Sequence, residues 1–194
     1  SVPVAGLPGA RGDGQPVLTL IELEAGTQLL HYFAGPSQAQ LLLSGSGGYG
    51  FIAHVGDMIS RQRGGKAFIT CNAGETVCAP SYIGGTSGSV PVPEATHIAC
   101  ASAGGRLLTF PIGELRTMPN GGRGLMLMSL EDKDVLIGAA AYTRSIRVQG
   151  TGRGGKPREE TLEIRSLNNA AAARGRKGKA ADWGFKPQRI RRIE

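Results

Sequence analysis

The stretch LLLSGSGGYGFIAHVGD, residues 41–57, is repeated as IACASAGGRLLTFPIGE, residues 98–114. The two copies align without a gap, so that Gly47-Gly48 falls on Gly104-Gly105. Apolar positions agree as well, for example Phe51 with Leu108. An internal period of this kind is typical of proteins built from stacked, similar units.

Turns with glycines beside a charged residue mark the same period along the rest of the chain. They recur at nearly even intervals, at Gly12-Asp13-Gly14, Gly64-Gly65-Lys66, Gly121-Gly122-Arg123 and Arg176-Lys177-Gly178. The charged residue is basic in three of these four turns. We therefore expect residues 1–194 to form a single domain of about four units, with Ser1 falling inside the first unit.

Each unit has the pattern of short strands joined by glycine turns, which the 31 glycines of the chain support. The expected strands are Gln40 to Ser44, Tyr49 to Val55, Lys66 to Asn72, His97 to Ala101, Arg106 to Ile112 and Arg123 to Leu130. A helical turn or two is expected only within Leu167 to Arg176. Strand-only units of about 50 residues predict an all-β, propeller-like ring of blades, in which neighbouring blades must stack to bury their apolar faces.

Charge is distributed unevenly along the chain. Residues 1–140 contain 8 Lys/Arg and 10 Asp/Glu, a net charge of −2, whereas residues 141–194 contain 14 Lys/Arg and 5 Asp/Glu, a net charge of +9. Either a basic tail or a polyanion-binding surface explains this asymmetry. The end of the chain favours a final strand, because Lys186, Arg189, Arg191 and Arg192 interleave with apolar residues and Trp183 precedes them as an anchor. A disordered tail is the alternative.

Three cysteines, Cys71, Cys78 and Cys100, have no CxxC spacing. A disulfide framework or a zinc site is therefore not expected, and buried thiols in a reducing cytoplasm are the interpretation that we favour. The sequence has no apolar run of about 18 residues and no signal-peptide pattern. We expect neither a metal nor a cofactor in this domain.

Two glycine-rich motifs resemble nucleotide sites. Residues 45–50 match GxGxxG, but a dinucleotide site needs a helix to begin there, and residues 51–55 have a strand pattern. Residues 150–156 match GxxxxGK, but Pro157 stands where a phosphate loop needs Ser or Thr. We interpret the first motif as a hairpin turn and the second as an exposed basic turn between Ile146 and Leu162.

The sequence offers little for catalysis. His31, His54 and His97 are scattered on apolar segments, and the acidic residues fall in turns and at strand edges. No nucleophile motif is present. Two alternatives to nucleic-acid binding stay open: a protein-interaction propeller with a nonspecific basic end, and a propeller enzyme with its site in a central channel.

The repeat and its basic turn resemble a known family. The segment Gly48-Tyr49-Gly50-Phe51, the following Asp57-Met58 and residues 61–67 (RQRGGKA) are similar to the C-terminal domain of bacterial type IIA topoisomerase A subunits. Residues 7–16 (LPGARGDGQP) resemble the first blade of the topoisomerase IV branch, whose A subunit is ParC. The similarity is firm over residues 1–130 and looser afterwards.

The resemblance implies a β-pinwheel of four-stranded blades that exchange strands, arranged in a closed or an open ring. It also implies DNA bending, and selection of the DNA crossing that an ATP-dependent enzyme passes during decatenation and supercoil relaxation. The catalytic residues would lie outside this chain, and the B subunit of topoisomerase IV (ParE) would be a partner of the full A subunit. Such an enzyme is cytoplasmic and associated with the chromosome, and we expect the isolated domain to be monomeric and without membrane contact.

One departure from the family pattern concerns DNA wrapping. Gyrase A subunits carry a Gln-Arg-Arg-Gly-Gly-Lys-Gly box in the first blade, where this chain has residues 8–14 (PGARGDG). Asp13 replaces the lysine and Ala10 replaces an arginine. The resemblance therefore favours topoisomerase IV over gyrase-like wrapping, and residues 61–67 are the nearest surviving box.

Glycine turns allow close approach to phosphates, and basic residues there add charge and hydrogen-bond donors. If the units form a ring, equivalent turns create a basic outer rim. We expect this rim to bind duplex DNA without sequence preference. The candidate DNA contacts are Arg61, Arg63, Lys66, Arg123, Arg144, Arg147, Arg153, Lys156, Arg174, Arg176, Lys177 and Lys179. Given the charge distribution, most of the affinity is expected from residues 141–194.

Overall fold

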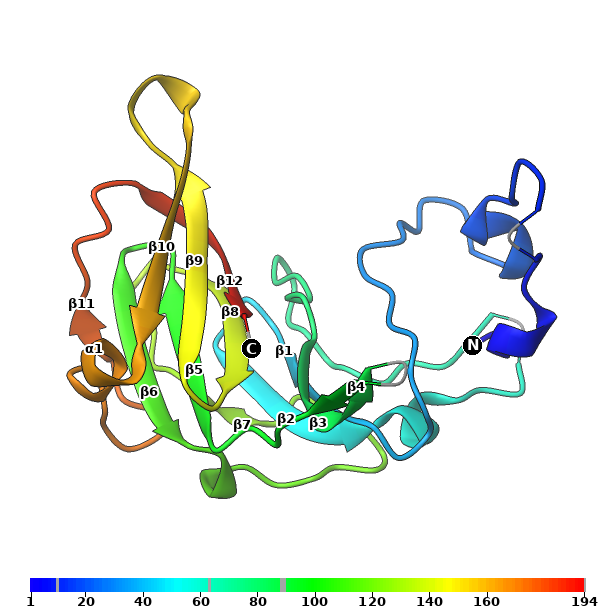
Figure 1. Ribbon diagram of the computed structural model, residues 1–194, viewed down its shortest axis with the longest axis horizontal. Coiled ribbons are helices and arrows are strands. Elements are labelled where there is room, and N and C mark those ends of the chain that lie inside the picture. Colours follow the sequence, from blue (N-terminus) through cyan, green and yellow to red (C-terminus); the bar gives the residue numbers. More distant parts are fainter. Residues whose placement is uncertain (10, 63, 88–89, 194) are drawn as a thin grey trace.

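The chain is an all-β molecule in the computed structural model, which describes residues 1–9, 11–62, 64–87 and 90–193. The strands form three antiparallel sheets, and the only α-helix within these residues is the short α1 (Ile164–Asn168). Figure 1 shows the sheets next to one another, with an extended N-terminal segment that reaches away from them. The predicted all-β pinwheel class is confirmed.

Each sheet combines a hairpin with strands from later in the chain. In spatial order the first sheet contains β4 (Val90–Val92), β3 (Ser81–Ser87), β1 (Gln40–Ser44), β2 (Tyr49–His54) and β7 (Leu125–Met126). The second contains β11 (Lys179–Ala180), β6 (Arg106–Pro111), β5 (His97–Ser102) and β8 (Leu136–Tyr142). The third contains β10 (Pro157–Glu163), β9 (Ser145–Thr151) and β12 (Lys186–Arg192).

The repeat in the sequence corresponds to a repeat in the way the strands pair. Strand β7 follows the second hairpin in the chain but pairs with β2 of the first sheet, and β11 pairs with β6 in the same way. The first two sheets therefore receive an outer strand from the following unit, as the resemblance implies. Before β1, the described part of residues 1–39 forms the 3-10 turns η1 (Val4–Gly6) and η2 (Val17–Leu20), and the division into about four units stays a prediction.

The GxGxxG motif is the turn of the β1–β2 hairpin. The amide of Gly45 donates to the carbonyl of Tyr49 at 2.9 Å, and that of Gly48 donates to the carbonyl of Gly45 at 3.0 Å. Gly48 has a φ of +85°, and a Cβ at this position would lie 2.5 Å from the Met128 carbonyl oxygen. Glycine is therefore needed for both backbone conformation and close approach, and the hairpin prediction is confirmed.

Two of the expected strands are wrong. Residues 66–72 form only an isolated bridge, from Ile69 to Gly122, because no strand among the described residues lies alongside to pair with the rest of this segment. Residues 123–130 are reduced to the two-residue β7, since Gly121, Gly122 and Gly124 all have positive φ and interrupt extended backbone just before it. The helical turn comes slightly earlier than expected, as α1, and Leu167 is its buried residue.

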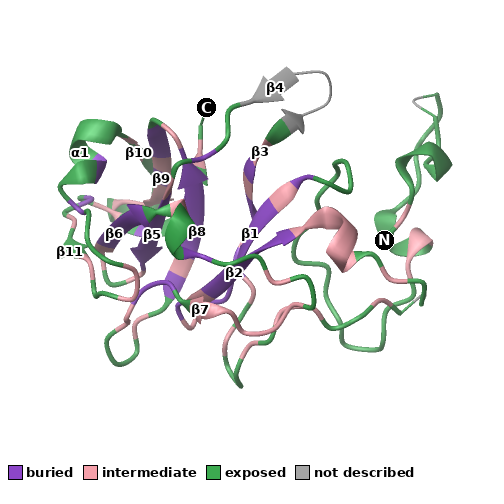
Figure 2. Ribbon diagram, turned by 90° about the horizontal axis from the view of Figure 1, so that it is seen from below, coloured by how far each residue is buried: buried purple, intermediate pink, exposed green. Residues whose placement is uncertain are grey.

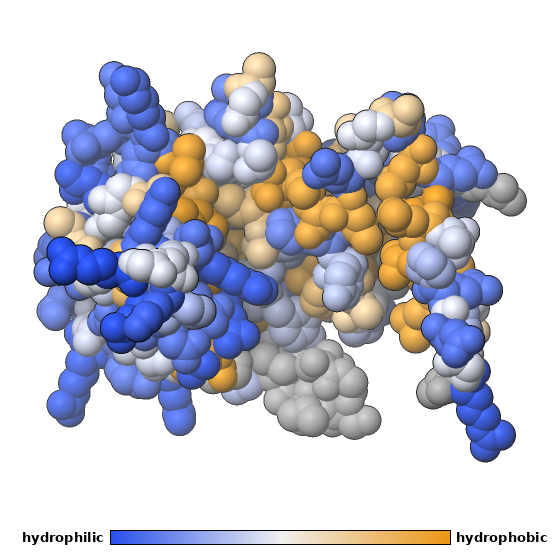
Figure 3. Space-filling model, turned by 90° about the horizontal axis from the view of Figure 1, so that it is seen from above, coloured by the Kyte–Doolittle hydropathy of each residue, from blue (hydrophilic) through white to orange (hydrophobic). Residues whose placement is uncertain are grey.

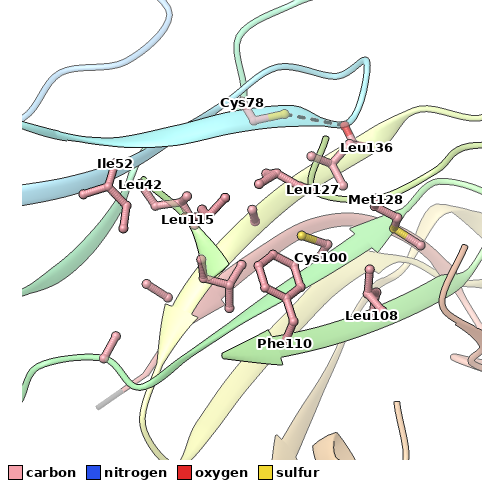
Figure 4. Close-up of a cluster of buried hydrophobic side chains, with 14 of the residues drawn as sticks. Leu42, Ile52, Cys78, Cys100, Leu108, Phe110, Leu115, Leu127, Met128 and Leu136 are labelled. Atoms are coloured by element: carbon pink, nitrogen blue, oxygen red, sulfur yellow. Dashed lines mark hydrogen bonds between the residues drawn. The ribbon is translucent and has the colours of Figure 1, made fainter. Parts of the chain in front are cut away.

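Stacking of consecutive sheets buries the core. Leu107 and Leu108 are neighbours on β6, yet their side chains enter different clusters, because successive residues of a strand point to opposite faces. Leu108 shares a cluster with Leu42 of the first sheet (Figure 4), whereas Leu107 shares a second cluster with Val148 of the third sheet. Figure 2 shows buried residues on strands of all three sheets, β1, β5, β8 and β9 among them. The second sheet is thus buried on both faces, which explains why its strands are almost continuously apolar.

Two of the three cysteines are buried in the core, as predicted. The Sγ of Cys78 donates to the carbonyl of Leu136 at 3.5 Å, as Figure 4 shows, and burial raises the pKa of this thiol to about 11. Burial also raises the pKa of Cys100, which lies in the same cluster. Cys71 is half-buried, and all three thiols are free.

Candidate nucleic-acid interface

The tip of the β9–β10 hairpin is an exposed basic segment. The chain turns through η5 (Arg153–Gly155), where Gly154 and Gly155 have φ of +70° and +76°. Arg153 and Lys156 are exposed beside these glycines. Figure 1 shows the hairpin projecting beyond the rest of the molecule, so the exposed basic turn predicted for residues 150–156 is confirmed.

One face of the third sheet is polar and basic. Ile146, Val148 and Ile190 are buried on the other face. The register places Arg191 opposite Arg147, and it places Arg189 opposite Gln149. Because cross-strand partners share a face, these arginines lie together on the side that turns away from the core.

The third sheet and its turns carry a strong positive charge. Residues 145–163 and 186–193 together hold eight Lys/Arg and three Glu, a net charge of +5. Arg147 is partly neutralised by Glu159, whose Oε1 lies 3.2 Å from Nη1 of the arginine. Like charges directly opposite in a sheet repel each other, so a bound anion would relieve the repulsion between the β12 arginines and Arg147. Hydrophilic side chains cover much of the same end of the molecule in Figure 3.

The basic turn at residues 121–124 is engaged within the protein. Nη1 and Nη2 of Arg123 donate to the two carboxylate oxygens of Glu75 at 3.2 and 2.9 Å. The guanidinium also lies over the ring of Tyr49, with its Cζ 4.2 Å from the ring centroid. The Asn72 amide and then Arg123 hold the pKa of Glu75 below its ordinary value, because both donate to the carboxylate. Arg123 therefore joins this turn to the preceding unit, which contains Tyr49 and Glu75.

The basic turn at residues 176–178 has an equivalent arrangement. Nζ of Lys177 lies 3.6 Å from Oε1 of Glu131, and Nη2 of Arg106 donates to the same oxygen at 2.7 Å. In the alignment of the repeat Arg106 falls on Tyr49, and Glu131 falls one position before the equivalent of Glu75. The turn cations are thus placed equivalently, each beside an acid of the preceding unit.

The other candidate contacts are dispersed. Arg61 is exposed in the loop after η3 (Val55–Met58), and Arg63 lies outside the described residues. Nζ of Lys66 donates to the carbonyl of Asp57 and lies 5.3 Å from the centroid of the Phe68 ring. Arg61 and Lys66 therefore lie in the loop after η3, and neither residue belongs to the basic third sheet.

Four candidates lie either in the turn before β9 or in the chain segment between β10 and β12, which contributes β11 to the second sheet. Arg144 is exposed in the turn between β8 and β9. Arg174 is half-buried and donates from Nη1 to the carbonyl of Met126 at 2.6 Å. Arg176 and Lys179 are exposed in the segment that leads into and forms β11.

Among the described residues, no group of three or more His, Cys, Asp or Glu is arranged to hold a metal ion. In the same residues no helix has the length and apolar character needed to cross a membrane. His54, at the end of β2, lies 3.3 Å from Asp57 and 3.2 Å from Gln40.

Known proteins are similar to this chain in sequence and in fold. A family described as DNA gyrase C-terminal domain, beta-propeller, matches residues 96–142. The A subunit of DNA topoisomerase 4 from Neisseria gonorrhoeae is 38% identical over 180 residues, which is 92% of this chain and 22% of that protein. The corresponding protein from Escherichia coli (strain K12) is 29% identical over 177 residues, 89% of this chain and 22% of that protein. The chain is related to the A subunits of DNA topoisomerase 4.

Solved structures agree with this relationship. The E. coli ParC C-terminal domain superposes with a TM-score of 0.75 and 25% identity, over 95% of this chain and 72% of that one. A DNA gyrase A C-terminal domain superposes with a TM-score of 0.66 and 18% identity, over 89% and 56%, which shows the fold alone. The predicted resemblance to type IIA topoisomerase A subunits is confirmed. The chain spans about a fifth of the length of the topoisomerase 4 proteins that it matches.

The structure also reveals exposed basic residues that were not among the candidate contacts predicted from the sequence. They are exposed on β10 and β12, namely Arg158, Lys186, Arg189 and Arg191. The expected final strand is confirmed as β12, and Trp183 is buried before it. Period-two alternation around the buried Ile190 was the signal that could have identified Arg189 and Arg191 as one exposed face.

Proposed function

We propose that this chain binds duplex DNA without sequence preference, with most of its contacts on the third sheet. The observation that carries the proposal is the set of six exposed cations on this sheet, Arg153, Lys156, Arg158, Lys186, Arg189 and Arg191. Their side chains suit phosphate oxygens, and backbone contacts of this kind give affinity without base readout. The exposed candidates Arg144, Arg176 and Lys179 would extend the surface.

The similarity to topoisomerase 4 A subunits supports a role for this chain in a topoisomerase. Within a full A subunit, the chain would bend DNA and present a crossing for passage, with the B subunit (ParE) as the ATP-dependent partner on the bacterial chromosome. Catalytic residues would lie in the part of the A subunit outside this chain. Bending a site of 20–30 base pairs by 40–90° costs on the order of 1–6 kcal/mol, which several phosphate contacts offset.

A salt titration of binding to a 30-base-pair duplex tests the proposal. Each phosphate contact adds about 0.9 to the slope of log affinity against log salt. Six contacts then predict a loss of on the order of 10³-fold between 50 and 200 mM salt. An affinity that is unchanged over this range would refute the electrostatic interface.

Charge reversal locates the contacts. We expect Arg189→Glu and Arg191→Glu to weaken binding and to flatten the salt dependence. Arg116→Glu is the matched control, because it makes the same change in charge at an exposed position close to the first sheet. Equal losses from all three variants would show that net charge, and not the third sheet, determines binding.

A further inference from the structure

Two glutamates occupy equivalent places in consecutive units and hold equivalent cations. Glu75 and Glu131 coincide to within one position when the two units are aligned. Their partners Arg123 and Lys177 stand at the same position of the glycine turn that recurs along the chain. The pairing is therefore a repeated feature of the fold.

The first pair has the geometry of an anion site that is already filled. Glu75 presents both carboxylate oxygens to the fork of Arg123, at 2.9 and 3.2 Å, and the Asn72 amide donates to Oε2 at 2.8 Å. Tyr49 supports the guanidinium from its face. A phosphate uses the same two parallel hydrogen bonds to an arginine as a carboxylate does. To bind Arg123 in this way, a phosphate must displace Glu75.

The second pair is looser and more open to solvent. The side chains of Glu131 and Lys177 are 48% and 61% exposed, compared with 19% and 28% for Glu75 and Arg123. Glu131 binds Arg106 closely, at 2.7 Å, and Lys177 at 3.6 Å. One carboxylate thus partly neutralises two cations at a position where a phosphate has access.

We propose that Glu75 and Glu131 are built-in competitors of DNA, which occupy the turn cations and keep the affinity of this chain for duplex DNA low. The proposal rests on the function proposed above and adds its regulation. Each carboxylate occupies the position on the turn cation that a DNA phosphate would take. A phosphate can therefore bind the cation only by displacing the glutamate. The third sheet, whose hairpin tip at residues 151–157 contains no acidic residue, then supplies most of the contacts.

Isosteric amides test the competition. In Glu75→Gln and Glu131→Gln the side chain keeps its size and one acceptor oxygen but loses its charge. We expect each variant to bind a 30-base-pair duplex more tightly, by up to roughly tenfold at 50 mM salt, with a salt slope steeper by about 0.9. Asp132→Asn is the matched control, because this exposed residue adjoins Glu131 and gives the same change in net charge.

Second substitutions identify the released cation. The gain from Glu75→Gln should disappear in an Arg123→Ala background, and the gain from Glu131→Gln should disappear when Arg106 and Lys177 are both alanine. Thermal unfolding of each variant serves as a check on folding. A loss of folding cannot imitate the expected result, since it would weaken binding. If Arg123→Ala does not fold, the more exposed Glu131 series provides the same test.

The outcomes separate this inference from the proposed function. Tighter binding that depends on the paired cation supports competition. If the unaltered chain binds DNA with a steep salt dependence, but both amide variants bind within twofold of Asp132→Asn, the competition is refuted and the DNA-binding function stands. If the unaltered chain does not bind DNA at all, both are refuted.

Discussion

Arg192 connects the three sheets, and its replacement with alanine should be among the most destabilising changes at a charged position. From β12 in the third sheet, Nη1 donates to the carbonyl of Ile83 at 2.8 Å. Nη2 donates to the carbonyl of Pro93 at 2.6 Å and to Oγ1 of Thr143 at 3.1 Å. The first two acceptors belong to the β3–β4 region of the first sheet, and Thr143 follows β8 of the second.

The magnitude follows from the number and kind of these bonds. A hydrogen bond from a charged donor contributes about 1.5–3 kcal/mol, and such contributions are not additive within one side chain. The carbonyl of Ile83 keeps a second partner, the amide of Ala95 at 2.8 Å, so it is not left unsatisfied. We therefore expect Arg192→Ala to lower the free energy of unfolding by about 2–4 kcal/mol. For a chain of this size that corresponds to a fall in Tm of roughly 4–16 °C.

Urea denaturation followed by circular dichroism measures the effect. Arg191→Ala is the control, because Arg191 is the adjacent residue, is exposed and lies on the opposite face of β12. Arg192→Lys should recover only part of the stability, since an ammonium group does not reproduce the planar fork. Ordinary surface substitutions change the free energy of unfolding by about 0.5 kcal/mol or less. If the free energies of unfolding of Arg192→Ala and Arg191→Ala differ by no more than this, the hydrogen bonds of Arg192 between the sheets do not stabilise the fold.

Three further predictions concern single residues. Gly48→Ala should lower the free energy of unfolding by about 1–3 kcal/mol, because its positive φ and a clash with a backbone carbonyl both oppose a side chain; a stability equal to that of the unaltered chain would contradict this account. Cys71 should react with a thiol reagent well before Cys100, since burial raises the pKa of Cys100 and covers its sulfur, and mass spectrometry of partly labelled protein would show the order. The Asn72 amide and then Arg123 lower the pKa of the Glu75 carboxylate from its ordinary value of 4.5, so these interactions stabilise the fold at neutral pH and are lost as pH falls below about 4.5 through the lowered pKa. The difference in Tm between the unaltered chain and Glu75→Gln should shrink over that range, and a constant difference down to pH 3 would exclude the proposed linkage.

Local patterns predicted the hairpins well. The β1–β2 and β5–β6 hairpins lie where glycine pairs separate apolar runs, because a positive φ at Gly48 and at Gly105 is a local requirement that the residue type reveals. The basic turn at residues 150–156 was predictable for the same reason, whereas the final strand β12 was predictable because basic and apolar residues alternate along it. Strands that depend on a distant partner were not predictable, as the isolated bridge within residues 66–72 shows.

The sequence by itself determined the repeat, the all-β class and the concentration of positive charge after residue 140, because these depend on composition and short-range spacing. Only the tertiary structure decided which cations are accessible. Arg123 is engaged by Glu75, an acid from a distant part of the chain, whereas Arg189 and Arg191 are exposed together on one face of a sheet. Strand exchange and cross-strand register bring such residues together or keep them apart, and both depend on pairing between distant segments, which spacing along the chain does not encode.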